Sequence, residues 1–248
     1  MPVRVYIPKN TETRDLPIVI VMHGTNRDGG RYRDDWVKIA QKNKIIIIAP
    51  TFSKKKFPKS SGYNLGNVFD KRHQRNEESL WAFSAIEPLF DTVVQALGGN
   101  QKEYTIYGHS AGSQFVHRYL FYKPNARVKR YIPANAGWYT LADMSEPYPY
   151  GLLGAEVSEE NLKAALQKDV IVLLGENDKD SNHKHLRRTP EAQRQGPHRL
   201  ARGITFYKNA ESQAKKLGVP FNWKVVVVPG AAHSNAQMLI GAVDFIEK

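Results

Sequence analysis

The stretch Tyr104–Tyr122, YTIYGHSAGSQFVHRYLFY, contains the pattern that decides the fold. Its first four residues are aromatic or β-branched, which is typical of a buried strand. Residues 113–122 have the patterning of a helix. Between the two stands GHSAG, a serine between glycines at a turn from strand to helix. In this context G-x-S-x-G predicts a nucleophile elbow, which exposes Ser110 above the carboxyl ends of the strands.

The two glycines of the elbow have a physical reason. Side chains at Gly108 or Gly112 would clash with the neighbouring strand and helix, and the turn itself is strained. The helix that begins behind the serine directs its positive end at any negative charge that develops there. The alternative interpretation is a tight glycine-rich turn that holds Ser110 by chance.

The rest of the chain alternates apolar, β-branched runs with helical segments such as Glu77–Leu97 and Asn209–Leu217. The apolar runs are Val3–Ile7, Ile18–Met22, Ile45–Ala49, Tyr104–Tyr107, Val128–Ile132, Val170–Leu174 and Val225–Val228. Several are apolar throughout, as in strands that are buried on both faces. This alternation predicts an α/β fold, with a mostly parallel central sheet covered by helices on both faces.

A serine hydroxyl is a weak nucleophile and needs a base. In folds with this elbow, an acid and then a histidine follow the serine along the chain. His233 follows the last strong strand in the loop PGAAHS, where small residues leave the imidazole room to reach the serine. Asp178 follows the strand Val170–Leu174, and Asp180 and Glu176 are the alternatives for the acid. We expect the acid to fix the imidazole tautomer.

The tetrahedral intermediate of acyl transfer needs backbone N–H donors for its oxyanion. One donor is the residue after the nucleophile, here Ala111. The second should come from an early loop, and HGTN follows the strand Ile18–Met22. We expect Thr25 to supply it, with Asn26 as the alternative.

Composition and length limit the other possibilities. With 248 residues and no interdomain linker, a single domain over residues 1–248 is expected. The chain has no cysteine, which excludes disulfides and thiolate nucleophiles. No apolar run is long enough to span a membrane. The start has no apolar signal segment, so we expect a cytoplasmic protein, or a secreted or periplasmic one whose signal peptide was removed.

The formal net charge is +12, and much of the excess lies in residues 54–75 and 179–202. Solvated basic loops are the simplest interpretation. No nucleic-acid-binding motif is present, so nucleic acid is not an expected partner. His183 and His185 lack a third ligand nearby in the sequence, so no metal site is expected. In the absence of a coiled-coil pattern, we expect a monomer.

Two long loops, 137–158 and 176–202, are candidates for a small lid or substrate walls. Trp138 and Tyr139 follow a strand and could contact substrate at the edge of the sheet, although buried packing is an equal alternative. The second loop also holds Arg187, Arg188 and Arg202, which could bind a substrate carboxylate or phosphate, or could form surface or structural ion pairs instead.

These features together resemble the α/β-hydrolase superfamily. HGT, GHSAG, the Asp178 turn and His233 are similar to its four functional loops, in order, over nearly the whole chain. HGTNRDGGRYRDDW and ANAGWYTLAD resemble the compact serine esterases, which include feruloyl-esterase-like and polyhydroxyalkanoate-depolymerase-like proteins. The resemblance implies hydrolysis of a carboxylic ester through a Ser-His-Asp triad and an acyl-enzyme, without a metal or an organic cofactor.

The alternatives keep the fold and change the function. A peptidase, a thioesterase or an acyltransferase would use the same triad. A noncatalytic polyanion-binding protein would use the basic loops instead.

Overall fold

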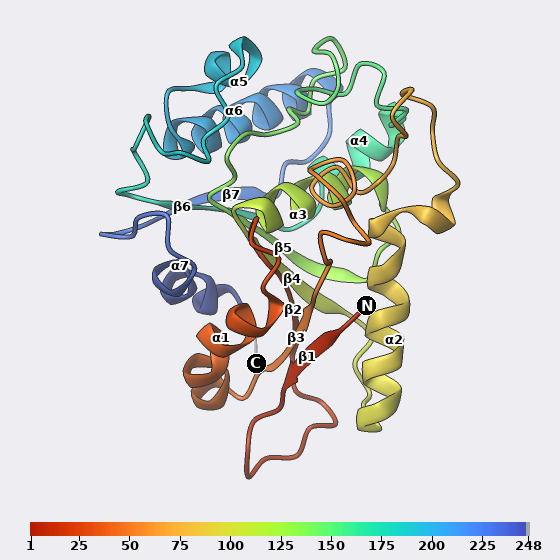
Figure 1. The fold of residues 1–248 in the computed structure, drawn as a ribbon, viewed down its shortest axis with the longest axis vertical. Helices are drawn as coiled ribbons and strands as arrows, with labels where there is room; N and C mark the ends of the chain where they lie inside the picture. Colours follow the sequence, from red (N-terminus) through yellow and green to blue (C-terminus); the bar gives the residue numbers. More distant parts are fainter. Residues whose placement is uncertain (247–248) are drawn as a thin grey trace.

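The computed structural model describes residues 1–246, and its centre is a seven-stranded sheet (Figure 1). The strands are β1 (Val3–Tyr6), β2 (Ile18–Met22), β3 (Ile46–Pro50), β4 (Tyr104–His109), β5 (Val128–Ala134), β6 (Val170–Gly175) and β7 (Trp223–Val228). Their order across the sheet is β1-β3-β2-β4-β5-β6-β7. Only β1 runs antiparallel to its neighbour, and the remaining pairs are parallel. The predicted mostly parallel sheet is confirmed.

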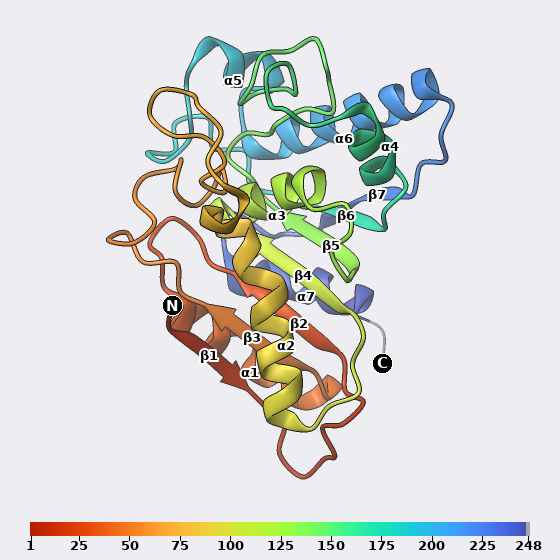
Figure 2. The ribbon, with the colours of Figure 1, turned by 90° about the vertical axis from the view of Figure 1, so that its right-hand side faces the viewer.

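Helices cover both faces of this sheet. They are α1 (Gly29–Asn43), α2 (Ile86–Leu97), α3 (Ala111–Tyr122), α4 (Glu159–Leu166), α5 (Pro190–Gln195), α6 (Arg199–Leu217) and α7 (Asn235–Ala242), with 3₁₀ turns at Glu78–Leu80, Ala82–Ala85 and Val243–Phe245. Helices α1 and α7 pack on one face, and α2, α3, α4 and α6 on the other (Figures 1 and 2).

Each face has its own apolar core. Ile20 of β2 belongs to the core under α2 and α3, whereas its neighbour Val19 belongs to the core under α1. Both side chains are fully buried. Because successive residues of a strand point to opposite faces, a strand covered on both sides must be apolar at every position. This is why the sequence runs are continuous rather than alternating.

The predicted helix Glu77–Leu97 is only partly correct. Its first half forms two 3₁₀ turns, separated by Trp81 in extended conformation. The Trp81 indole N–H donates to the Asn76 carbonyl at 2.9 Å, and the Ala82 amide donates to the Gly66 carbonyl at 2.7 Å. The Ala82 amide would donate within a continuous helix, but here it bonds to a distant loop, and helical periodicity alone does not reveal such a contact.

The loop predicted at 176–202 is shorter than expected. It contains helix α5, and α6 begins at Arg199 rather than at Asn209. The His198 ring accepts a hydrogen bond from the Ala201 amide at 3.2 Å and caps α6. Histidine is not among the residues that commonly cap helices, so the sequence carried no clear start signal.

The strand order reverses direction between β2 and β4. From β2 the chain passes through α1 to β3 on one side, and it then returns through α2 to β4 on the other side of β2. In open α/β sheets, such a reversal opens a crevice beyond the carboxyl ends of the strands, and ligands bind there. The turn after β2 and Ser110 after β4 both lie at this point.

The elbow fits against β2 at very close range. Ser110 has φ 59° and ψ −113°, a strained backbone conformation for a residue with a side chain. A Cβ at Gly108 would lie 2.3 Å from the Gly112 carbonyl oxygen, and one at Gly112 would lie 2.0 Å from the Met22 carbonyl oxygen. No side chain fits at either position, as expected from the sequence.

None of the helices in residues 1–246 combines the length and the apolar character needed to cross a membrane.

The replacement Gly112→Ala tests this close packing. The new methyl group would collide with the Met22 carbonyl, a backbone group that cannot rotate away. We expect the free energy of unfolding to fall by about 1–3 kcal/mol, as overpacking typically costs. The measurement is urea denaturation followed by circular dichroism. Gly30→Ala is the control, because its Cβ would come no closer than 3.4 Å to Asp28 and alanine favours the helix. Equal stability changes in both variants would contradict the packing argument.

Candidate active site

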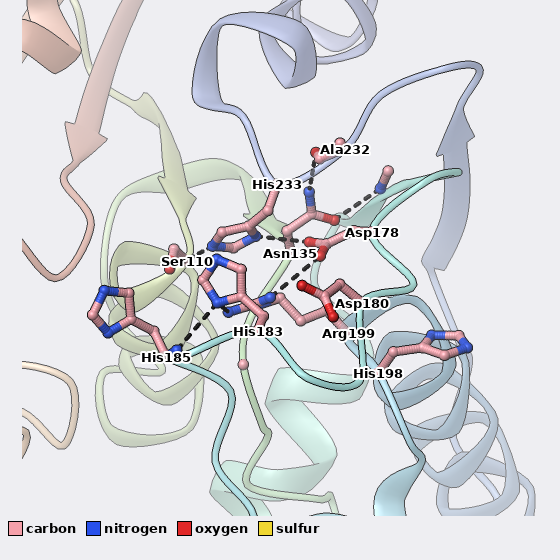
Figure 3. A network of polar contacts seen from close by, with 12 residues as sticks. Ser110, Asn135, Asp178, Asp180, His183, His185, His198, Arg199, Ala232 and His233 are labelled. Atoms are coloured by element: carbon pink, nitrogen blue, oxygen red, sulfur yellow. Dashed lines mark hydrogen bonds and ion pairs between the residues drawn. The ribbon is translucent and has the colours of Figure 1, made fainter.

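Ser110, His233 and Asp178 form a continuous chain of hydrogen bonds (Figure 3). The Ser110 Oγ lies 3.0 Å from His233 Nε2, and His233 Nδ1 lies 2.7 Å from Asp178 Oδ2. A carboxylate only accepts hydrogen bonds, so Nδ1 carries the ring proton. Nε2 is therefore left to accept from the serine hydroxyl, which is the arrangement a general base requires.

The loops that carry the histidine and the acid are tied together by the backbone. Asp178 closes a turn at the end of β6, where its amide donates to the Gly175 carbonyl at 3.1 Å. The next contact joins this turn to the loop after β7, because the Asn177 amide donates to the Ala231 carbonyl at 2.8 Å. His233 lies two residues further along that loop. The distance between acid and histidine is thus set by main-chain contacts.

Asn135 is a third link between these loops, and sequence reasoning missed it. Its side chain is buried, accepts from the Gly175 amide at 2.8 Å, and donates to the Ala232 carbonyl at 3.3 Å (Figure 3). Its backbone has φ 51°, a left-handed conformation that asparagine tolerates well. The only sequence signal was an asparagine directly after a strand, in ANAG.

A cavity of about 180 Å³ opens beside the serine. It is lined by Gly24, Thr25, Asn26, Asp28, Arg31, Tyr32, His109, Ser110, His183, His185 and His233. The lining comes from the turn after β2, the start of α1, the elbow, and the loops after β6 and β7. A small substrate group in this cavity would therefore contact both the Ser110 hydroxyl and the His233 ring.

The two candidate oxyanion donors border the same region. Ala111 begins α3, and the first amides of a helix have no acceptor within it. Thr25 lies in a turn that the Arg27 amide closes by donating to the Gly24 carbonyl at 3.1 Å, and it lines the cavity. Asn26, the alternative donor, lines the cavity as well.

His23 braces the turn that holds Thr25. Its Nε2 accepts from the Phe52 amide at 3.0 Å, so Nδ1 carries the proton and donates to the Gly24 carbonyl at 3.1 Å. Burial lowers the pKa of His23 to about 4, because the charged ring would be desolvated. The ring is therefore neutral at neutral pH and acts as a fixed support.

His109 packs against the proposed base and lines the cavity. Its ring is buried, lies 4.7 Å from the His233 ring between centroids, and its Nδ1 is 3.0 Å from the Tyr32 hydroxyl. Burial holds the pKa of His109 well below its usual range, and the nearby His233 lowers it further. His109, at the variable position of the elbow, is thus a neutral packing residue.

The loop after β6 adds two histidines to the cavity lining, and helix α6 adds a buried cation beside the acid. His183 and His185 line the cavity, and the His183 ring lies 5.5 Å from the His233 ring. Arg199 is 1% exposed and pairs with Asp178 at 3.3 Å, a contact that sequence reasoning did not foresee. Within residues 1–246, no three His, Asp or Glu side chains are arranged to hold a metal ion.

Trp138 and Tyr139 do not line the cavity. Tyr139 is fully buried and stacks on Phe206 with ring centroids 4.5 Å apart. Trp138 is 4% exposed, and its ring lies 4.3 Å from the Arg118 guanidinium and 4.7 Å from that of Arg187. These contacts favour the packing alternative over the substrate wall, because the ring faces are covered by protein.

Arg202 is also removed from the candidate substrate contacts. It is fully buried and donates to the Gly137 carbonyl at 2.5 Å and to the Gly196 carbonyl at 2.8 Å. It therefore ties the loop after β5 to the start of α6. Of the two long loops, 176–202 contributes to the cavity through His183 and His185, whereas 137–158 does not.

The role of Asn135 can be separated into its side chain and its backbone. Asn135→Gly removes both side-chain hydrogen bonds and keeps the left-handed conformation, whereas Asn135→Ala also strains the backbone. We expect unfolding free energies lower by about 1–3 kcal/mol for glycine, with a further loss of about 1–2 kcal/mol for alanine. Chemical denaturation measures both. Stability equal to wild type in the glycine variant would show that the bridge between the loops contributes nothing.

Comparisons with solved structures show two close overall likenesses. Poly(aspartic acid) hydrolase-1 from Sphingomonas sp. KT-1 is 44% identical, with a TM-score of 0.95 over 98% of this chain and 92% of that one. LpqC, a poly(3-hydroxybutyrate) depolymerase from Bordetella parapertussis, is 34% identical, with a TM-score of 0.91 over 98% and 82%. FphF, a fluorophosphonate-binding serine hydrolase of Staphylococcus aureus, shares the fold at 15% identity and a TM-score of 0.61.

No curated protein matches the chain significantly. Residues 1–125, which make up half of the chain, match the family described as "Putative esterase". This range contains the turn after β2 and the nucleophile elbow. The predicted α/β-hydrolase resemblance is confirmed, and the chain belongs to this esterase family.

Proposed function

We propose that this protein cleaves carboxylic esters as a serine hydrolase, with Ser110 as the nucleophile, His233 as the base and Asp178 as the orienting acid. The observation that carries the proposal is the hydrogen-bond chain from the Ser110 hydroxyl through His233 to the buried Asp178 carboxylate. It lies at the mouth of a cavity, in a chain of an esterase family. The reaction needs neither a metal nor an organic cofactor.

The acylation half of the reaction begins when the Ser110 oxygen attacks the ester carbonyl carbon. His233 Nε2 takes the hydroxyl proton as the new bond forms, and the carbonyl oxygen becomes an oxyanion. The amides of Ala111 and Thr25 then donate hydrogen bonds to that oxygen. The bond from carbon to the alcohol oxygen breaks, and His233 returns its proton to the leaving alcohol. An acyl group remains on Ser110.

Deacylation repeats these steps with water in place of serine. His233 removes a proton from water as the water oxygen attacks the acyl carbon, and the second tetrahedral intermediate collapses. The Ser110 oxygen leaves and regains its proton from His233. Asp178 stays ionised throughout and stabilises the imidazolium that forms twice in each cycle.

The groups around Ser110 and His233 favour the oxyanion and the imidazolium that form during the reaction. The N-terminus of α3 lies directly behind Ser110, and the positive end of a helix stabilises a developing anion. His109, next to His233, is kept neutral by burial, so it adds no positive charge to oppose formation of the imidazolium.

Hydrolysis of a polyanionic amide, such as poly(aspartic acid), is a second candidate function. It is favoured by the 44% identity to poly(aspartic acid) hydrolase-1, and by the excess of basic residues in this chain. Arg31 lines the cavity and could meet a carboxylate of such a polymer. The poly(3-hydroxybutyrate) depolymerase relative supports the ester reading instead, since that polymer is a polyester.

The proposed nucleophile is tested with p-nitrophenyl acetate and butyrate. We expect wild-type protein to hydrolyse both esters, and Ser110→Ala to lose a factor of about 10⁴–10⁶ in kcat, because the attacking oxygen is gone. Spectrophotometric release of p-nitrophenol measures both variants. Circular dichroism verifies that Ser110→Ala is folded. Turnover by that variant within tenfold of wild type would refute the assignment.

The substrate class is tested by comparing poly(aspartic acid) with poly(3-hydroxybutyrate), following the products by chromatography. If the polyanion is the substrate, Arg31→Gln should raise its KM by up to about fivefold, the usual range for an exposed charge pair. Lys38→Gln is the matched control, because Lys38 is exposed two turns further along α1 and outside the cavity. An equal effect of both variants, or turnover of the polyester alone, would reject the second candidate.

A further inference from the structure

The acid of the proposed triad has a second partner besides the histidine. Asp178 Oδ2 accepts from His233, while the Arg199 guanidinium lies 3.3 Å from Oδ1 (Figure 3). The side chains of Asp178 and Arg199 are 2% and 1% exposed. Both carboxylate oxygens are therefore held, one by the base of the proposed reaction and one by a buried cation.

Arg199 is fixed by the start of α6. It is the first residue of that helix, which the His198 ring caps. The next amide, of Leu200, donates to the Asp178 carbonyl at 3.3 Å, so the helix start abuts the turn that carries the acid. The cation consequently approaches the carboxylate from the capped first turn of a helix.

The other arm of the guanidinium reaches the rim of the cavity. Arg199 Nη2 lies 3.1 Å from His183 Nδ1, and a guanidinium can only donate, so the ring nitrogen accepts. His183 in turn lies against the His233 ring and lines the cavity. Burial of its ring and the nearby Arg199 charge lower the pKa of His183, which keeps it neutral and able to accept.

A buried ion pair is a poor source of stability, because both ions lose their hydration. In proteins, replacing such a pair with apolar side chains of similar volume is often neutral or stabilising. The charge of Arg199 has, however, a direct effect on the reacting groups. It fixes the orientation of the carboxylate, and it offsets part of the attraction that the carboxylate exerts on a protonated His233.

We propose that Arg199 is a positioning residue of the hydrolytic site: it holds Asp178 in the orientation that His233 needs, and its charge helps His233 to release its proton. The inference rests on the proposed function and goes beyond it. Arg199 touches no substrate, since it lies behind Asp178 and is not part of the cavity lining.

Several titratable or charged groups lie around His233 and influence its protonation. Ser110 and His109 face it from the elbow, Asp178 from the turn after β6, and His183 from the following loop. Arg199 acts from α6 through Asp178, and its charge is also felt by Asp180 on the same turn. Arg31 and Asp28, at the start of α1, line the same cavity and add one positive and one negative charge. Of these groups, the variants below alter only Arg199.

The test compares Arg199→Met, Arg199→Lys and Arg202→Met. Arg202 is the matched control: it lies one turn further along α6 and is also buried, but it donates to backbone carbonyls. In Arg199→Met, Asp178 loses the opposing charge and holds the imidazolium more tightly. We expect the acidic limb of the kcat/KM profile to move to higher pH by about one unit. We also expect kcat on p-nitrophenyl butyrate to fall about 100-fold, with KM within about threefold.

Arg199→Lys keeps the charge and should retain the wild-type acidic limb, with kcat reduced by no more than about tenfold. Arg202→Met should lower the denaturation midpoint and leave the limb where it is. A limb that stays in place in Arg199→Met, or that moves equally in Arg202→Met, would overturn the proposal. A loss of kcat in Arg199→Met that equals the loss of folded protein would also overturn the proposal.

The same question can be decided without turnover. Titration of ¹⁵N-histidine-labelled protein follows the His233 ring resonances, which should change at higher pH in Arg199→Met than in wild type and Arg202→Met. Folded wild-type protein that hydrolyses no ester would contradict the proposed function alone. Identical His233 titrations in all variants would contradict the role of Arg199 alone.

Discussion

The close approach of the elbow to the end of β2 is the constraint on which the site depends. The Gly112 backbone lies against the Met22 carbonyl, and this contact leaves no room for a side chain. The strand order reverses between the same two strands, so their carboxyl ends open a crevice. Ser110 and the turn holding Thr25 therefore border one cavity, although they lie far apart in the sequence.

The remaining parts of the site depend on contacts between loops at the far side of that crevice. Asn135, fully buried, joins the loop after β7 to the turn after β6. Arg199 then holds the carboxylate of Asp178 from behind. The proposed base is thus located by one chain of contacts from β5 to α6, all of which the protein itself supplies. A preorganised arrangement of this kind is what electrostatic catalysis demands.

The sequence predicted the parts of the molecule that are set by local pattern. Continuous apolar runs predicted strands buried on both faces, and GHSAG at a strand end predicted the elbow. It failed where a tertiary contact decides the outcome. The Ala82 amide bonds to the Gly66 carbonyl and interrupts a helix that periodicity favoured, and an unusual His198 cap starts α6 early. The sequence did not identify Arg199, because only its burial beside Asp178 distinguishes it from the many other basic residues of the chain.

The central claim is that the substrate acyl group is transferred to Ser110. The most direct measurement is to quench wild-type protein with acid during turnover of p-nitrophenyl butyrate, and then to analyse its tryptic peptides by mass spectrometry. The account predicts a mass increase of one butyryl group on peptide 103–118, which contains Ser110, and none in Ser110→Ala. Turnover with the butyryl group on another peptide, or on the same peptide in Ser110→Ala, would contradict it.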